Sequence, residues 1–178
     1  MAVFFAWIAW HLPPSCWRMW YRLLVWLALP VLWAWARGVE RRALREGRPL
    51  RRGERRLARL AGVRHAGRIR VCEVLEMPRP GLRWMHGVAA RWGLSMDDTL
   101  GLSLRYGIYL RKGMGGKLET LAHECVHTAQ YERLGGLWVF LERYLRECLA
   151  VGYERAPMER EAAEQATRLV LESRRSAG

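Results

Sequence analysis

The sequence predicts an α+β protein in which a small sheet is followed by packed helices. Three short segments, 69–75, 100–104 and 107–111, carry alternating or clustered apolar residues and lie near proline or glycine, as strands do. From Lys117 onward, apolar residues recur at three- and four-residue spacing, as in amphipathic helices. Strands grouped before helices are typical of the α+β class.

Composition indicates one domain with one basic segment. The 178 residues are enough to bury a sizeable core, and the four cysteines form no Cys-x-x-Cys pair, which favours free thiols in a reducing compartment. The net charge of +13 is uneven. Residues 37–70 hold thirteen arginines against three glutamates, giving +10, whereas residues 71–178 sum to +1. The basic character therefore belongs to one stretch.

Residues 1–36 form an apolar segment that we expect to be helical. Seven of the ten tryptophans lie here: Trp7, Trp10, Trp17, Trp20, Trp26, Trp33 and Trp35. The unbroken apolar run of residues 23–36 contains Pro30 and is shorter than the roughly 20 residues of a membrane span. Counting from Met19, with Arg22 near one end, makes a span feasible.

Three interpretations of residues 1–36 remain open. The segment is a single span with its N-terminus outside, or a helical hairpin that turns at Pro13-Pro14 and lies in the membrane interface. In the third interpretation it is a helix that packs on the domain or on a partner. A secretory signal fits poorly, because the first seventeen residues carry no positive charge.

Residues 37–68 are expected to form an arginine-rich helical linker. Beside an apolar anchor, the run Arg37–Arg70 is typical of a flank held to anionic lipid head groups, which would place the protein in the cytoplasm at the inner face of the cell membrane. The alternative is a solvated helix whose inward positions are Leu44, Leu57 and Leu60. A nucleic-acid interface is disfavoured, because no aromatic residues alternate with the arginines.

Residues 69–116 are predicted to supply the sheet. A strand at Ile69–Leu75 is closed by prolines, and a helix at Leu82–Leu94 follows it. Segments Leu100–Leu104 and Gly107–Arg111 flank Arg105-Tyr106 as a hairpin would. The glycine-rich stretch 112–116 then forms a flexible turn into the next helix.

The helix predicted at Lys117–Leu134 carries His-Glu-x-x-His. It ends at Gly135-Gly136. On a helix, His123 and His127 stand one turn apart on one face, where two imidazoles can hold one Zn²⁺ and leave Glu124 beside the open position as a general base. Cys125 points away from that face and is interpreted as a buried free thiol.

A third ligand is expected from the helix that starts at Pro157, after a helix at Leu137–Val151. Glu159 shares its face with a stripe of small and apolar residues: Ala162, Ala163, Ala166, Leu169 and Val170. Glu161 lies on a polar face. A carboxylate buried at the head of an apolar stripe needs a cation, which favours Glu159 as the ligand. The alternative is that Glu159 only complements the helix dipole.

These segments resemble the gluzincin zinc metallopeptidases. The likeness covers about residues 117–167 and is closest to small bacterial gluzincin-like domains that read His-Glu-x-x-His-x-x-Gln and end near Pro-x-Glu-x-Glu-Ala. It implies a zincin-like fold for residues 69–178: a small sheet with an edge strand, an active-site helix and a glutamate helix carrying Glu159. Gly107–Arg111 is the candidate edge strand, which would bind an extended peptide by strand addition.

One position departs from the wider clan. Membrane-bound relatives carry Asp four residues after the ligand glutamate, where it orients a histidine, and this chain has Ala163 there. Gln130 lies on the His127 face of the helix and is a candidate for that orienting role, with a helix-surface amide as the alternative. Tyr153, together with Tyr106 and His86, is a candidate to stabilise the oxyanion.

The sequence therefore predicts a zinc metalloendopeptidase that binds one Zn²⁺ through His123, His127 and Glu159. Glu124 is the predicted general base, and the substrate is a peptide or protein. The alternative function is a non-catalytic, zinc-stabilised module attached to a membrane or partner through residues 1–36.

Overall fold

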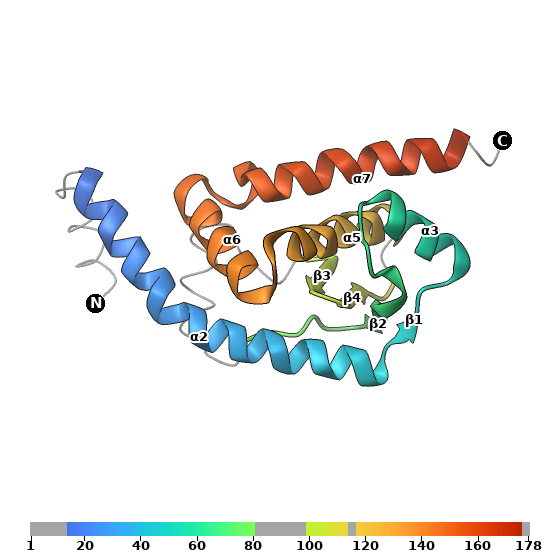
Figure 1. The fold of residues 1–178 in the computed structure, drawn as a ribbon, viewed down its shortest axis with the longest axis horizontal. Helices are drawn as coiled ribbons and strands as arrows, with labels where there is room; N and C mark the ends of the chain where they lie inside the picture. Colours follow the sequence, from blue (N-terminus) through green and yellow to red (C-terminus); the bar gives the residue numbers. More distant parts are fainter. Residues whose placement is uncertain (1–13, 81–98, 114–116, 176–178) are drawn as a thin grey trace.

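The computed structural model describes residues 14–80, 99–113 and 117–175. Within these ranges the chain is α+β, as predicted: five α-helices surround one mixed four-stranded sheet (Figure 1). The elements are α2 (Pro14–Glu46), β1 (Arg48–Pro49), α3 (Arg52–Leu60), the 3-10 turn η1 (Ala66–Arg68), β2 (Arg70–Val74), β3 (Gly101–Leu104), β4 (Gly107–Arg111), α5 (Lys117–Leu134), α6 (Leu137–Val151), the 3-10 turn η2 (Tyr153–Arg155) and α7 (Pro157–Arg175).

The sheet has the strand order β1-β2-β4-β3. β3 and β4 form the predicted antiparallel hairpin around Arg105-Tyr106. β2 lies parallel to β4, with Val71 opposite Ile108. The prediction that Gly107–Arg111 is an edge strand is therefore wrong. Among the described strands, β4 lies inside the sheet, and the other strand of the hairpin, β3, is at the edge. A local pattern predicts that a segment is a strand, but it does not show which distant segment pairs with its second side.

Helices cover both faces of the sheet (Figure 1). Ile108 and Leu110 point into the main core, which lies between the sheet, α3, α5 and α7. Tyr109 points to the other face, where its hydroxyl donates to the Val39 carbonyl of α2 at 2.9 Å. α2 comes closest at Gly107, where a Cβ atom would lie only 2.7 Å from the Cβ of Ala43. Helices on both faces of the sheet therefore contact β4.

The arginine-rich stretch is part of this packing. α2 runs without a break through positions 36 and 37, so the expected boundary between an apolar segment and a linker falls inside one helix. α3 contributes Leu57 and Ala58 to the main core. Of the three leucines expected to point inward, only Leu57 is buried, whereas Leu44 and Leu60 are exposed. The arginine-rich stretch therefore belongs to helices that pack on the rest of the domain.

The structure bears on few of the membrane-related predictions. No helix in residues 14–80, 99–113 and 117–175 is both long enough and apolar enough to cross a membrane. Pro14 begins α2, while Pro13 lies outside the described residues. The helix predicted at Leu82–Leu94 also lies outside them.

The C-terminal helices agree with the predicted bounds. α5 ends before Gly135 and Gly136, whose φ angles of 86° and 140° belong to the region that favours glycine. α7 lies along α5 (Figure 1) and brings Ala162 and Ala166 into the main core. Ala163 is exposed, so the stripe of small residues is narrower than predicted.

Glu132, near the end of α5, holds the turn that precedes β2. Its carboxylate accepts hydrogen bonds from the backbone N–H groups of Arg64 at 2.6 Å and His65 at 3.0 Å. It also accepts from the hydroxyl of Tyr106 in the β3–β4 hairpin at 3.1 Å. Burial raises the pKa of Glu132, but the bonds from the Arg64 and His65 amides outweigh it and hold the pKa below its usual value.

Replacing Glu132 by glutamine is expected to lower the free energy of unfolding by about 1–3 kcal/mol at neutral pH, because amide donors lose a charged acceptor. The folded pKa lies below the usual value of 4.5, so this stabilisation is complete above about pH 4.5 and is lost as the pH falls through the folded pKa. Urea unfolding of both proteins at pH 7 and near pH 3 measures the difference. Glu164→Gln, at an exposed site on α7, is the control. A difference of equal size at both pH values would contradict this account.

Candidate metal centre

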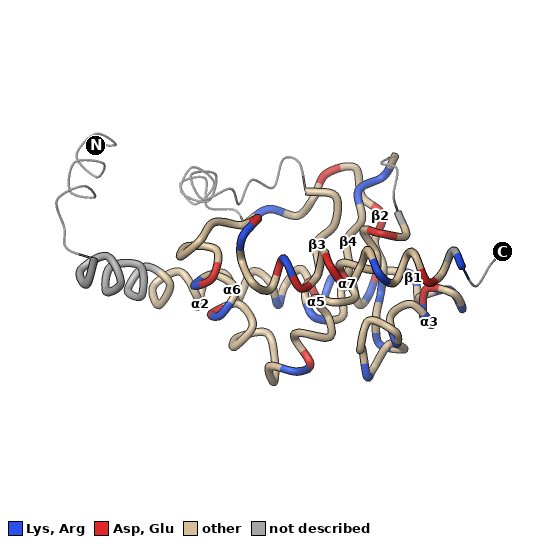
Figure 2. Tube along the Cα trace, turned by 90° about the horizontal axis from the view of Figure 1, so that it is seen from above, with Lys and Arg blue, Asp and Glu red and all other residues tan. Residues whose placement is uncertain are grey.

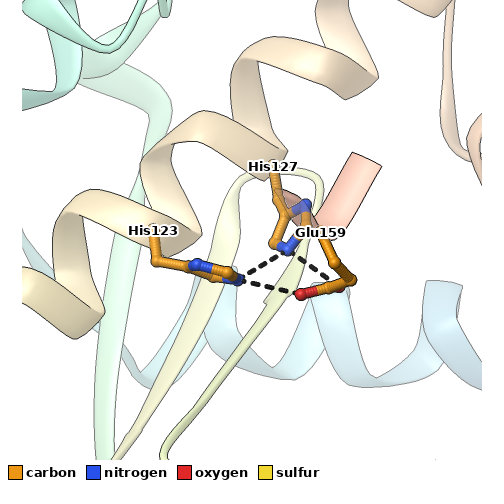
Figure 3. A group of neighbouring side chains, drawn as sticks. All are labelled: His123, His127 and Glu159. Atoms are coloured by element: carbon orange, nitrogen blue, oxygen red, sulfur yellow. Dashed lines mark hydrogen bonds and ion pairs between the residues drawn. The ribbon is translucent and has the colours of Figure 1, made fainter. Parts of the chain in front are cut away.

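α5 presents two histidines side by side. Its buried residues Leu121, Ala122, Cys125 and Val126 hold one side of the helix against the core, which leaves the opposite side for the imidazoles. The Nε2 atoms of His123 and His127 lie 3.0 Å apart (Figure 3). His127 is buried and His123 is partly exposed. The four-residue spacing thus produces the convergence that it predicts.

The first turn of α7 brings Glu159 to the same point. Its carboxylate is 5 % exposed and lies 3.2 Å from each histidine, with Oε2 near His123 Nε2 and Oε1 near His127 Nε2 (Figure 3). Glu147 of α6 accepts from the backbone N–H of Met158 at 2.9 Å and so caps the start of α7. Glu161 is partly buried, pairs with Arg133 at 2.8 Å and accepts from the buried Gln130 at 3.1 Å. The burial of Glu159 agrees with the predicted apolar helix face.

The three ligand groups fit a tetrahedral zinc ion. Two ligands bound about 2.0–2.1 Å from a tetrahedral zinc lie about 3.3 Å from each other. The observed separations are 3.0 Å between the two histidines and 3.2 Å from each histidine to Glu159. All three ligand atoms lie within 4.8 Å of one another. Two imidazoles and one carboxylate are also the donor types that zinc prefers.

Gln130 determines which nitrogen of His127 is free. Gln130 is fully buried, and its amide nitrogen donates to the Met158 carbonyl at 3.0 Å and to Glu161 Oε2 at 3.1 Å. Its oxygen is therefore the atom 2.8 Å from His127 Nδ1, and Nδ1 carries the proton. In neutral His127 the Nε2 lone pair then faces the carboxylate of Glu159. Such a contact is repulsive unless a proton or a cation lies between the two atoms.

Glu124 is a buried carboxylate beside this cluster. Burial raises its pKa to about 7, His123 acts to lower it, Glu159 raises it further, and the backbone N–H of Ser103 lowers it. A pKa in this range suits a group that accepts and returns protons at neutral pH. β3 lies close over the side chain, because a Cβ at Gly101 would come within 2.5 Å of Glu124 Oε1. Only glycine leaves room for the carboxylate in this position.

Tyr144 is a site residue that the sequence did not single out. Its hydroxyl donates to Glu159 Oε1 at 2.7 Å. Desolvation and the neighbouring Glu159 hold the pKa of Tyr144 well above its usual value. Tyr144 lies on the apolar face of α6, where its spacing by itself indicates only a packing residue. The available signal was its hydroxyl, since a tyrosine on a buried helix face needs a hydrogen-bond partner.

The other candidates are distributed as follows. Tyr153, in η2, hydrogen-bonds Glu159, and burial and that carboxylate raise its pKa well above the usual value. Tyr106 donates to Glu132 and not to a residue of the cluster. His86 lies outside the described residues. Cys125 is a buried free thiol in the main core, as predicted.

The absence of Asp at position 163 does not leave His127 without an orienting partner. Ala163 lies on the exposed side of α7. The partner of His127 is Gln130, from α5 itself. The orienting role predicted for Gln130 is thus matched by a direct hydrogen bond.

Replacing Gln130 by methionine is expected to weaken zinc binding about 10–100-fold, because His127 loses the acceptor that fixes its orientation. A zinc-competition titration with a chromogenic chelator measures the affinity. Gln165→Met, at a partly buried glutamine on α7, is the matched control. Unchanged zinc affinity in Gln130→Met would show that the bond to His127 does not support metal binding.

Comparison with protein-family models, with curated proteins and with solved structures found no match for this chain. The case for a function therefore depends on the geometry and chemistry of the cluster itself.

Proposed function

We propose that this protein is a zinc-dependent metallopeptidase with a zincin-like domain, hydrolysing peptide bonds in a peptide or protein substrate. The observation that carries the proposal is the convergence of His123, His127 and Glu159 at zinc-ligand separations beside the buried carboxylate of Glu124. The resemblance of residues 117–167 to gluzincins implies roles for the same four residues.

The ion would be held by His123, His127 and Glu159. Neighbouring side chains orient two of these ligands. Gln130 keeps the proton of His127 on Nδ1, so Nε2 is free to bind. Tyr144 donates to Glu159 and fixes the rotation of its carboxylate. When bound, zinc would polarise the substrate carbonyl and lower the pKa of a bound water towards about 7.

Glu124 is the proton carrier in this mechanism. It accepts a proton from the attacking water and passes it to the nitrogen of the leaving amine. The desolvated position of Glu124 raises its affinity for that proton, and Ser103 N–H holds the side chain in place. Tyr153 would turn its hydroxyl from Glu159 to donate a hydrogen bond to the oxyanion that develops on the substrate carbonyl.

β3 is the strand that would receive the substrate. It is the edge of the sheet beside α5, and its residues Gly101 and Ser103 lie against Glu124. An extended peptide that pairs with this edge would run past the general base. This assignment replaces the one made from sequence, which chose β4.

The proposal is tested by measuring zinc and proteolysis in the purified full chain. We expect about one zinc per chain by elemental analysis, and cleavage of an unfolded protein that a chelator abolishes and added zinc restores. His127→Ala should lose both the zinc and the activity. His65→Ala, which removes an exposed histidine outside the cluster, should keep both. A wild-type protein that takes up no zinc would overturn the proposal.

A non-catalytic, zinc-stabilised module is the second candidate. It is favoured by the close cover over Glu124, which is only 5 % exposed and has the backbone of Gly101 against its carboxylate. In such a module the zinc would join α5 to α7 and contribute to folding. The two functions differ in what they predict for Glu124.

A further inference from the structure

The outward face of α2 is apolar between residues 26 and 31. Trp26, Leu27 and Val31 are 69 %, 57 % and 45 % exposed. Leu27 and Val31 lie on the side of the helix opposite the buried Val25 and Leu29, and Trp26 lies between the two sides. On its buried side this part of α2 packs against α6 (Figure 1). Residues 25–36 of α2 carry no charge and are drawn in tan in Figure 2, after the grey turns that contain Arg18 and Arg22.

The same face becomes basic toward the C-terminal end of α2. Arg41, Arg42 and Arg45 are all exposed there. Glu40 is buried on the other side, whereas the exposed Glu46 at the end of α2 pairs with Arg42 at 2.9 Å and leaves Arg41 and Arg45 as the arginines of this face outside that pair. At the boundary, the Arg37 guanidinium lies 5.1 Å from the centre of the Trp33 ring. At 1.5 Å per residue, the face from Trp26 to Arg45 is about 28 Å long.

This division of one helix face matches the layers of a membrane surface. Exposed indole and aliphatic side chains partition into the interface, and arginines bind lipid phosphates just outside it. A nucleic acid would use the arginines but would leave Leu27 and Val31 in water. We propose that the outward face of α2, residues 26–45, binds the surface of an anionic lipid bilayer. Residues 26–31 lie deeper in the bilayer interface, and Arg41 and Arg45 contact the lipid head groups.

This orientation accounts for the large apolar side chains that α2 exposes. They lie on one face over a few turns, as in helices that enter the membrane interface at an angle. The buried face of α2 stays on the domain, so binding requires no unfolding. In this arrangement α7 lies on the far side of the domain from the membrane (Figure 1).

The test is co-sedimentation of the full chain with vesicles of phosphatidylcholine alone or with phosphatidylglycerol added. We expect binding that requires the anionic lipid and weakens with salt. The double variant Leu27→Glu/Val31→Glu should reduce binding at least about tenfold, since each leucine-sized side chain contributes strongly when buried. Arg41→Gln/Arg45→Gln should reduce it by about fivefold per arginine and flatten the salt dependence.

Matched controls lie on α7. Leu171→Glu and Arg168→Gln/Arg175→Gln change exposed residues of the same types and should leave binding intact. Circular dichroism verifies that every variant is folded. Absence of binding to either vesicle, or equal losses in the α2 and α7 variants, would overturn the proposal. So would a concentration-dependent dimer that only Leu27→Glu/Val31→Glu disrupts, because the face would then bind a second copy of the chain.

Discussion

Replacing Glu124 by glutamine is expected to lower kcat/KM for peptide hydrolysis by about 10²–10⁴-fold while zinc stays bound. The amide has nearly the shape of the carboxylate, but it cannot accept the proton of the attacking water. Since Glu124 is not one of the converging ligand groups, the ion should be retained. Initial rates on an unfolded protein substrate and elemental zinc analysis on the same preparations measure both quantities.

The control for this variant is Glu119→Gln, which changes an exposed glutamate in the first turn of the same helix. It should leave activity and zinc content unchanged. Equal activity in Glu124→Gln and wild type would remove Glu124 as the base. Bound zinc in a protein without measurable proteolysis, with or without Glu124, would instead identify the non-catalytic module.

Replacing Glu159 by glutamine is expected to weaken zinc binding by more than about 100-fold. Losing a partner that only orients a ligand already costs about 10–100-fold, and Glu159 is a ligand whose charge offsets that of the ion. Burial raises the pKa of this carboxylate, but its contacts with His123 and His127 and the hydrogen bond from Tyr144 outweigh burial and hold the pKa far below its usual range. The charge is therefore present at any pH where zinc binds.

Glu161→Gln is the matched comparison, because it tests the rival glutamate of the same helix turn. Its glutamine side chain keeps an oxygen that can accept from Gln130 and Arg133, so zinc affinity should change little. Zinc titrations of the three proteins give the affinities, and the rise in melting temperature on adding zinc gives an independent readout. If Glu161→Gln were the variant that loses zinc, the ligand assignment would be wrong.

The local sequence pattern determined most of the elements and their chemistry. Bounds predicted for the three C-terminal helices and the hairpin agree with the structure, because periodicity and flanking glycines are local signals. The choice of Glu159 over Glu161 also came from helix periodicity, since a face is fixed within a few residues. His123 and His127 needed only one helix turn to meet.

Tertiary structure decided which distant segments meet. It placed β4 inside the sheet and β3 at its edge, since the parallel pairing of β2 with β4 depends on contacts far apart in the chain. It also decided that the helices of the arginine-rich stretch pack in the domain, because the buried sides of α2 and α3 are defined by their contacts with the sheet and the other helices.

The site itself divides in the same way. The sequence alone determined the ligand types and their spacing, because the groups on one helix face follow from helix geometry. Tyr144 as the partner of Glu159, the proton position on His127 and the cover of Gly101 over Glu124 were decided only when α6, α7 and β3 came together. Each depends on hydrogen bonds or close approach between elements, and those are set by packing rather than by local pattern.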